Sequence, residues 1–140
     1  MTQAPSRFEF KVDGPPVSYQ VRDRLRLQAW KDVVRAEAMR LWLAGQAPVM
    51  HRLQITVVYY HEGDEADIDN DNMLKPIQDA LNGVVYSDDR QITDTRIRRT
   101  SIEGLYQAKL MPPVVAAGFV KGAAFVYVRV EDAPDHSEIL

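Results

Sequence analysis

The sequence contains no cysteine and only three histidines among its 140 residues. The absence of cysteine excludes disulfides, thiolate zinc sites and a cysteine nucleophile, and it favours a reducing, cytoplasmic location. Three scattered histidines also disfavour an imidazole-rich metal site. No apolar run reaches the length of about eighteen residues that a membrane span requires, and the first residues lack a basic-then-apolar signal. We therefore expect neither a membrane segment nor a secretory leader.

The sequence also lacks a glycine-rich phosphate loop, a serine–histidine pair and an aromatic cage, so none of these suggests a function. Its 46% apolar and 26% charged residues match an average globular protein. A chain of 140 residues suffices for one domain with a real core. We find no internal repeat and no linker. The expected organisation is a single domain over residues 1–140.

The formal net charge of −3 does not by itself favour nucleic acid as a partner. The charges are unevenly distributed, however. Residues 22–40 carry six cations against three carboxylates, and residues 90–99 carry four against one, so each stretch has a local balance of +3. The negative excess lies in residues 62–71 and in the C-terminal tail. Patches of opposite sign are compatible with a phosphate-binding surface beside a metal site.

Hydrophobic periodicity predicts a strand and a long helix in the first third of the chain. Residues 8–12 alternate between apolar and charged side chains, as in a half-buried strand. Over residues 23–44, apolar residues recur at three- and four-residue steps, which predicts one helix that Gly45 ends. Trp30 and Trp42 lie on its apolar stripe, and core packing is the expected role of both.

Further strands are predicted over residues 53–60, 91–100 and 123–130. A second helix is expected to begin between residues 72 and 75, because Pro76 is tolerated only near a helix start.

Two segments complete the expected order. A turn at residues 87–89 leads into the strand over 91–100, and the apolar stretch 105–120 stays ambiguous because Pro112-Pro113 interrupts it. The expected fold is a small α/β (α+β) domain, with a mixed β-sheet and two main helices in the order β-α-β-loop-α-β-β.

An acidic segment dominates the middle of the chain. It holds six carboxylates and no Lys or Arg: Glu62, Asp64, Glu65, Asp67, Asp69 and Asp71. Carboxylates at this density repel one another, and a folded domain holds them together when a positive group lies among them. A divalent cation that prefers hard oxygen ligands is the natural candidate.

The spacing within this segment indicates how the carboxylates could meet. If residues 67–71 are extended, then Asp67, Asp69 and Asp71 project to one face and can present several oxygens to one cation. Asp71 also lies where the following helix begins, and unpaired N–H groups favour an ionised carboxylate there. A solvated loop with a helix cap is the simpler alternative for both Asp69 and Asp71.

Residues beyond the segment complete a pattern typical of phosphodiester hydrolysis. Lys75 follows Asp71 by one helical turn, and Asp88 and Asp89 would join from a separate turn. Carboxylates can hold one or two Mg²⁺ ions, which activate a bound water and neutralise the phosphate. An ammonium group adds electrostatic stabilisation. Lys75 could instead form an ordinary surface pair with Asp79.

Residues 69–92 carry a recognisable motif: Asp69-Asn70-Asp71-Asn72-Met73-Leu74-Lys75-Pro76-Ile77-Gln78-Asp79-Ala80-Leu81-Asn82-Gly83, followed by Asp88-Asp89-Arg90-Gln91-Ile92. This stretch resembles the signature of the RusA-type Holliday junction resolvases (crossover junction endodeoxyribonucleases). That signature is an Asp-x-Asp-Asn, a Lys four residues after the second Asp, an Asp-Ala-Leu and a later Asp-Asp pair. Elsewhere the likeness is an order of elements: an early Pro-Pro segment, a long helix and a strand entering the motif.

The resemblance implies a RusA-like fold and a homodimeric, Mg²⁺-dependent endonuclease. Such an enzyme cuts four-way DNA junctions by paired, symmetric incisions, in DNA recombination and repair. Mn²⁺ would substitute for Mg²⁺, and no small-molecule cofactor is implied. The resemblance makes Asp69, Asp71 and Asp89 the essential, metal-binding carboxylates. It makes Lys75 the essential lysine, with Asp88 as an additional candidate ligand. One departure is visible, because the family members are basic and this chain is acidic.

Two alternative functions fit part of the pattern. A calcium-binding loop of the EF-hand type needs glycine at its sixth position and glutamate at its twelfth, where this sequence has Asn72 and Gln78. A catalytically idle DNA-binding or regulatory protein on the same fold would not need all three matched carboxylates and the lysine. Both alternatives therefore rank below the junction nuclease.

Arginines supply the candidates for contact with DNA. Arg96, Arg98 and Arg99 lie in the strand expected over residues 91–100, with Arg96 and Arg98 on one face. Arg24 and Arg26 lie near the start of the long helix. Duplex phosphates would meet such residues, but a solvated surface explains them equally well. The apolar stretch 105–120 is a candidate for part of a dimer contact.

Overall fold

The structure is a computed structural model that describes residues 7–42, 45–64, 66–104 and 110–137. Its elements follow in the order β1 (Arg7–Asp13), α1 (Arg24–Leu41), β2 (Leu53–His61), α2 (Asn70–Leu81), the 3₁₀ turn η1 (Asp89–Gln91), β3 (Ile92–Ser101), α3 (Pro113–Lys121) and β4 (Phe125–Asp132). None of the described helices is both long enough and apolar enough to cross a bilayer.

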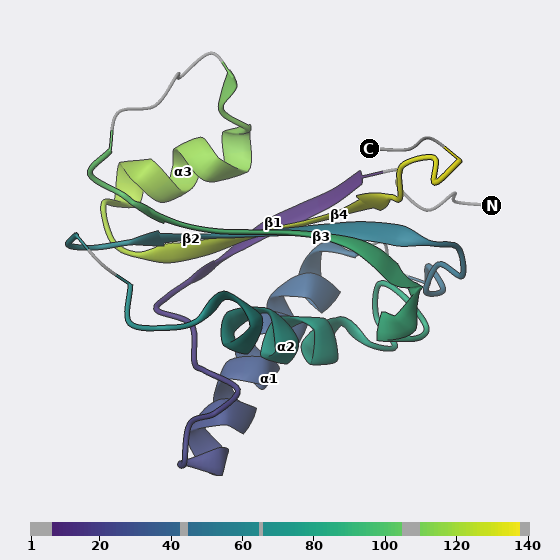
Figure 1. Cartoon of the computed structure of the whole chain (residues 1–140), viewed down its shortest axis with the longest axis horizontal. Coiled ribbons are helices and arrows are strands. Elements are labelled where there is room, and N and C mark those ends of the chain that lie inside the picture. The colour runs from purple at the N-terminus through teal and green to yellow at the C-terminus, as the bar shows by residue number, and fades with distance from the viewer. Residues whose placement is uncertain (1–6, 43–44, 65, 105–109, 138–140) are drawn as a thin grey trace.

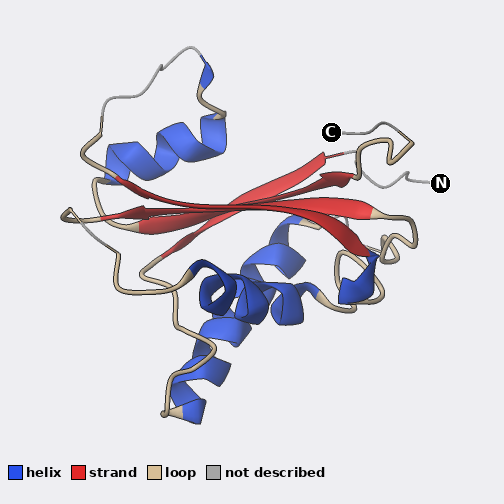
Figure 2. Cartoon of the chain, viewed as in Figure 1, coloured by secondary structure: helices blue, strands red, loops and turns tan. Residues whose placement is uncertain are grey.

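One four-stranded mixed sheet forms the centre of the molecule, with strand order β1-β4-β2-β3. β1 and β2 both pair antiparallel with β4, whereas β2 and β3 are parallel. Parallel neighbours need a crossover connection, and α2 provides it. Figure 1 shows α1 and α2 on one face of the sheet and α3 on the other. Figure 2, in the same view, colours the helices blue and the strands red and again shows helices on both faces of the sheet. This α+β architecture confirms the expected fold class.

The main core lies between the sheet and the α1–α2 layer. Val34 on α1, Ile77 on α2 and Val57 on β2 are all fully buried within it. Trp30 and Trp42 also belong to this core, and the Trp42 ring meets Phe8 edge-on at 5.0 Å between centroids. The expected packing role of both tryptophans is confirmed. A smaller cluster under α3 contains Val115, Phe125 and Tyr127.

The long helix ends earlier than expected. α1 stops at Leu41, and Trp42 has an extended backbone with its N–H bonded to Ala38 O. The helix therefore does not run to residue 44. This extended backbone brings the Trp42 ring onto Phe8 of β1, so packing against the sheet decides the boundary. Residues 43–44 lie outside the described part of the chain.

α2 begins at Asn70, before the expected window of residues 72–75, and Pro76 lies inside it. Proline lacks the N–H that would bond the carbonyl four residues earlier, which here belongs to Asn72. That carbonyl instead accepts a hydrogen bond of 2.9 Å from the Tyr19 N–H. A segment distant in sequence thus satisfies the group that Pro76 leaves free, and the proline is tolerated in the helix interior.

The stretch 105–120 contains a third helix that the sequence pattern did not predict. Pro113 is the first residue of α3, a position that suits proline because its missing N–H would be unpaired there. Gly122 ends the helix with a left-handed backbone, φ 76°. The two prolines therefore start a helix, and do not interrupt one. Residues 105–109 lie outside the described part.

Candidate active site

Residues 66–69 of the acidic segment form a bent loop, the acidic loop, that is held against the sheet. Ala66 and Ile68 are half-buried against the main core. Arg99, near the end of β3, donates a hydrogen bond of 2.8 Å from Nη1 to Ile68 O. The backbone bends at Asp67 and Ile68 and enters α2 at Asn70. Residues 67–71 are therefore not extended, so the condition under which Asp67, Asp69 and Asp71 would share one face is not met.

Asp69 and Asp71 both lie at the N-terminus of α2. Asp69 is the N-cap residue, and its backbone carbonyl accepts the first helical hydrogen bond from the Met73 N–H at 3.0 Å. The side chain of Asp69 makes no capping hydrogen bond to this helix. Asp71 lies in the first turn, and both side chains are exposed. The helix N-terminus carries partial positive charge, which attracts anionic groups.

Lys75 connects α2 to the Asp88–Asp89 corner. Its ammonium lies 3.1 Å from Asp89 Oδ2 and 2.9 Å from Asp79 Oδ1. The surface pair with Asp79 and the contact with the matched carboxylate Asp89 therefore both exist. Hydrogen bonds to Asp79 and then to Asp89 raise the pKa of Lys75 well above its usual range. The Lys75 side chain consequently remains a cation at neutral pH.

The corner itself is built around Asp88. Asp88 Oδ1 accepts from the Arg90 N–H at 2.9 Å, and the Gln91 side chain accepts from the Asp88 N–H at 2.9 Å, which forms a capping box on η1. The Arg90 backbone N–H and then its guanidinium lower the pKa of Asp88. Gln91 also donates to Val49 O at 3.0 Å. Asp88 thus caps the turn, and Asp89 faces Lys75.

The four matched residues do not form a closed metal cage. Among the described residues, no group of three or more His, Cys, Asp or Glu side chains is placed to hold a metal ion. Lys75 lies about 6 Å along the helix axis from Asp71, and Asp89 contacts the lysine. The donor chemistry suits a hard dication, because all three carboxylates offer oxygen. A site that includes all three carboxylates would need side chains to rearrange.

Two side chains of α1 contact α2 and the residue that follows it. Lys31 Nζ lies 3.4 Å from Asp79 Oδ2, which extends the ion pairs into a chain of Lys31, Asp79, Lys75 and Asp89. Arg35 Nη1 donates to Asn82 O at 2.9 Å at the end of α2. Sequence reasoning missed Lys31, since helical periodicity shows which face is apolar and not which distant acid a lysine contacts.

The structure separates the candidate DNA-binding arginines. Alternation along β3 directs Arg99 to the α2 face, where it holds the acidic loop, and directs Arg96 and Arg98 to the α3 face. Arg24 Nη1 donates to Tyr19 O at 2.9 Å and to Val21 O at 3.2 Å, so it secures the segment before α1.

Comparison with known families adds a second line of evidence. The family model described as Endodeoxyribonuclease RusA matches residues 4–109 of the 140-residue chain. The chain belongs to the RusA family. The match spans β1 to β3 and includes every residue of the motif, and it ends before α3. No individual curated protein matches the sequence significantly.

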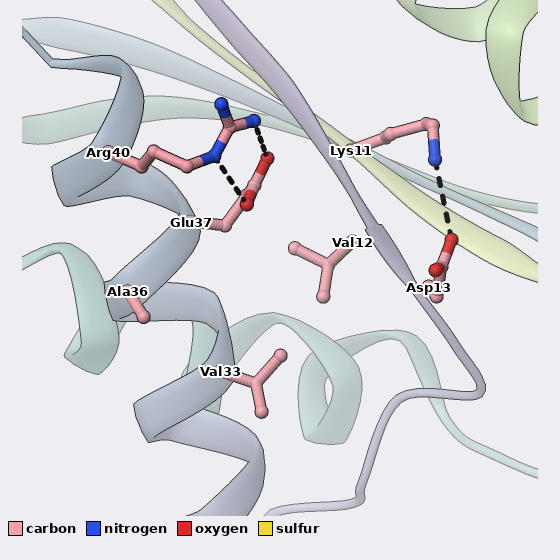
Figure 3. Close-up of a pocket in the computed structure, with 7 residues that line it drawn as sticks. All are labelled: Lys11, Val12, Asp13, Val33, Ala36, Glu37 and Arg40. Carbon is pink, nitrogen blue, oxygen red and sulfur yellow. Dashed lines mark hydrogen bonds and ion pairs between the residues drawn. The ribbon is translucent and has the colours of Figure 1, made fainter.

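No residue of the RusA-family motif lines either of two hollows in the described part of the chain. A hollow of about 380 Å³ lies beside the acidic loop and is lined by His61, Asp64, Ala66 and Arg99. A second, of about 440 Å³, lies between β1 and α1 (Figure 3). Its charged groups pair with each other, Arg40 with Glu37 and Lys11 with Asp13. The motif residues themselves therefore define the candidate site, at the α2 N-terminus and the adjoining Asp88–Asp89 corner.

Proposed function

We propose that this RusA-family protein is a Mg²⁺-dependent endodeoxyribonuclease that resolves four-way DNA junctions in recombination and repair. The observation that carries the proposal is the contact between Lys75 and Asp89, 3.1 Å long, one helical turn from Asp71. This contact joins two parts of the family motif that are separate in the sequence. Membership of the family supplies the reaction class.

The carboxylates are the metal ligands in this proposal. Asp69, Asp71 and Asp89 would hold Mg²⁺, and Mn²⁺ would substitute for it. When bound, the ion supplies an activated water and neutralises charge on the phosphate. Two of the three carboxylates are exposed at the start of α2, where a DNA strand can reach them.

Lys75 has an electrostatic role and does not act as a base. Because its pKa is raised, the side chain stays protonated and cannot accept a proton at neutral pH. A fixed ammonium near the scissile phosphate stabilises the charge that develops in the transition state. Asp79 orients Lys75, and Lys31 in turn contacts Asp79 at 3.4 Å. Arg99 keeps the loop that leads to Asp69 against the sheet.

Paired incision requires two active sites on one junction. An isologous homodimer presents two identical sites related by a two-fold axis, which matches the symmetry of a four-way junction. The overall charge of −3 does not attract DNA, so the local arginine clusters would have to supply the phosphate contacts.

Asp71→Asn tests the proposal most simply. We expect this change to abolish junction cleavage in Mg²⁺ while DNA binding is kept or tightened, because one negative charge near the phosphate is removed. Asp32→Asn on the exposed surface of α1 is the matched control, and it should cleave like the wild-type protein. Cleavage by Asp71→Asn at the wild-type rate would refute the assignment. Binding without cleavage by the wild-type protein would indicate the alternative, an idle DNA-binding protein.

A further inference from the structure

The sheet face opposite the active site carries a second polar site. A hollow of about 490 Å³ lies there, within the range of small-ligand pockets, about 300–1,000 Å³. We call it the arginine hollow. Thr56, Arg96, Arg98 and Arg129 form its polar part, and Val58 and Val115 are among its apolar residues. Figure 1 shows α3 over one end of this face.

Strand register places the polar groups in one row. Thr56 on β2 is opposite Arg96 on β3 and opposite Arg129 on β4. Directly opposed side chains on one face are about 5 Å apart at Cβ, so the arginine side chains start on either side of the threonine. Arg98 lies two residues from Arg96 and faces the same side.

Two buried polar atoms in this row lack a hydrogen bond. Thr56 is only 7% exposed, and its Oγ1 has no hydrogen-bond partner among the described residues. Arg129 Nε forms an ion pair with Glu131 Oε2 at 2.9 Å, although it makes no hydrogen bond within the same set. Buried polar groups are normally satisfied. Both atoms line the hollow or belong to residues that do, so a ligand with acceptor oxygens would satisfy them.

The carboxylates on this face do not neutralise Arg96 and Arg98. Glu9 accepts from the Tyr127 hydroxyl, Glu131 lies beside Arg129, and Asp94 lies 2.7 Å from His136 Nε2. Arg96 and Arg98 themselves have no hydrogen bond or ion pair within residues 7–42, 45–64, 66–104 and 110–137. Two free guanidinium groups beside a hydroxyl therefore favour an anion with several acceptor oxygens.

We infer that the arginine hollow binds the phosphate of a deoxynucleotide, with the sugar and base against its apolar wall. The arginines and Thr56 suit phosphate oxygens, and Val58, Val115 and Tyr127 suit the less polar remainder. The choice of a deoxynucleotide rests on the proposed function. The site itself is on the opposite face of the sheet from Asp69, Asp71 and Asp89, so it contacts DNA away from the bond that is cut.

The test is titration of the full chain, without divalent metal, followed by amide NMR signals. Thymidine 5′-monophosphate, inorganic phosphate and thymidine are added separately. We expect the nucleotide to shift signals of β2, β3 and β4 around Thr56, phosphate to do so more weakly, and thymidine to have no such effect. Arg96→Gln should weaken nucleotide binding roughly tenfold or more, as expected for one charge-assisted hydrogen bond. Thr56→Val should weaken it roughly threefold to tenfold.

Arg22→Gln is the matched control, because it removes the same charge from an exposed residue before α1. It should leave nucleotide affinity unchanged. Three results would overturn the inference. The first is that the nucleotide shifts no amide signals, and the second is that Arg22→Gln weakens nucleotide binding as much as Arg96→Gln does. The third is that Arg96→Gln changes the oligomeric state while the protein binds no nucleotide. The titration does not depend on cleavage, so an absence of nucleotide binding would leave the nuclease proposal intact. Conversely, the cleavage result for Asp71→Asn does not bear on nucleotide binding in the arginine hollow.

Discussion

At the scale of single residues, Lys75 is the centre of the proposed active site. Two carboxylates share its ammonium, at 2.9 Å and 3.1 Å. Such contacts between partly exposed groups contribute little to stability. Their larger effect is positional, because they hold a long, flexible side chain in one place beside the start of α2.

The ion pairs of Lys75 predict a specific alkaline dependence of stability. Its pKa is raised above the ordinary value of 10.5 in the folded state, mainly by Asp79 and then by Asp89. The contribution is therefore fully present below pH 10.5 and is lost as pH rises through the folded pKa. We expect the difference in melting temperature between the wild-type protein and Lys75→Gln to be constant from neutral pH to this value, and to shrink above it.

Thermal scans in a series of alkaline buffers measure this difference. Lys121→Gln is a suitable control, since Lys121 pairs with Asp13 on the far side of the sheet. A difference that is already shrinking near neutral pH would contradict a raised Lys75 pKa.

The sequence motif identified Lys75, Asp69, Asp71 and Asp89 as candidates, but it did not give their arrangement. The two possible partners of Lys75, Asp79 and Asp89, both contact it. The sequence could not show this, because Asp89 reaches the lysine through the turn at η1. Asp88 caps η1, and Asp89 contacts Lys75. The sequence alone left open which of the two acids has which role.

At the scale of elements, α2 shows how a distant segment can change a helix boundary. Pro76 alone suggested a later start, because a proline inside a helix leaves one carbonyl without its hydrogen bond. Here the Tyr19 N–H donates to that carbonyl, Asn72 O, so the helix can begin earlier. Strand ranges were predicted well, because alternation is a local signal. The start of α2 and the existence of α3 depend on contacts between segments, which periodicity does not contain.

α3 depends on a small residue at its contact with β4. A Cβ on Gly118 would lie 2.3 Å from the Phe125 ring, which itself stacks on Tyr60. We expect Gly118→Ala to destabilise the protein, because overpacking typically costs about 1–3 kcal/mol and exceeds the gain in helix propensity, about 1 kcal/mol. The melting temperature should fall by a few degrees, at about 2–4 °C per kcal/mol for a domain of this size.

Ala117→Leu adds a side chain on the exposed face of the same helix and is the control. It should leave the melting temperature nearly unchanged. A Gly118→Ala variant as stable as the wild-type protein would show that α3 does not need this close approach.

At the scale of the whole molecule, charge is divided between distinct regions. The acidic loop and the carboxylates of the motif lie on the α2 side, while Arg96, Arg98 and Arg129 lie on the opposite sheet face. A net charge of −3 therefore conceals a basic surface and an acidic one.

Metal binding to the acidic region should stabilise the folded protein. We expect millimolar Mg²⁺ or Mn²⁺ to raise the melting temperature, because a ligand of the native state stabilises it by about 2.7 kcal/mol at a concentration one hundred times its Kd. The increase should be lost in an Asp69→Asn, Asp71→Asn double variant and retained in Asp32→Asn. Equal increases in all three proteins, or none in the wild type, would contradict a metal site at the α2 N-terminus.

The most direct measurement compares cleavage of a four-way junction, a flap, a linear duplex and single-stranded DNA by the wild-type protein in Mg²⁺. We expect preferential cutting of the junction, with paired nicks placed symmetrically in opposing strands. Equal cutting of all four substrates, or an intact junction, would contradict it.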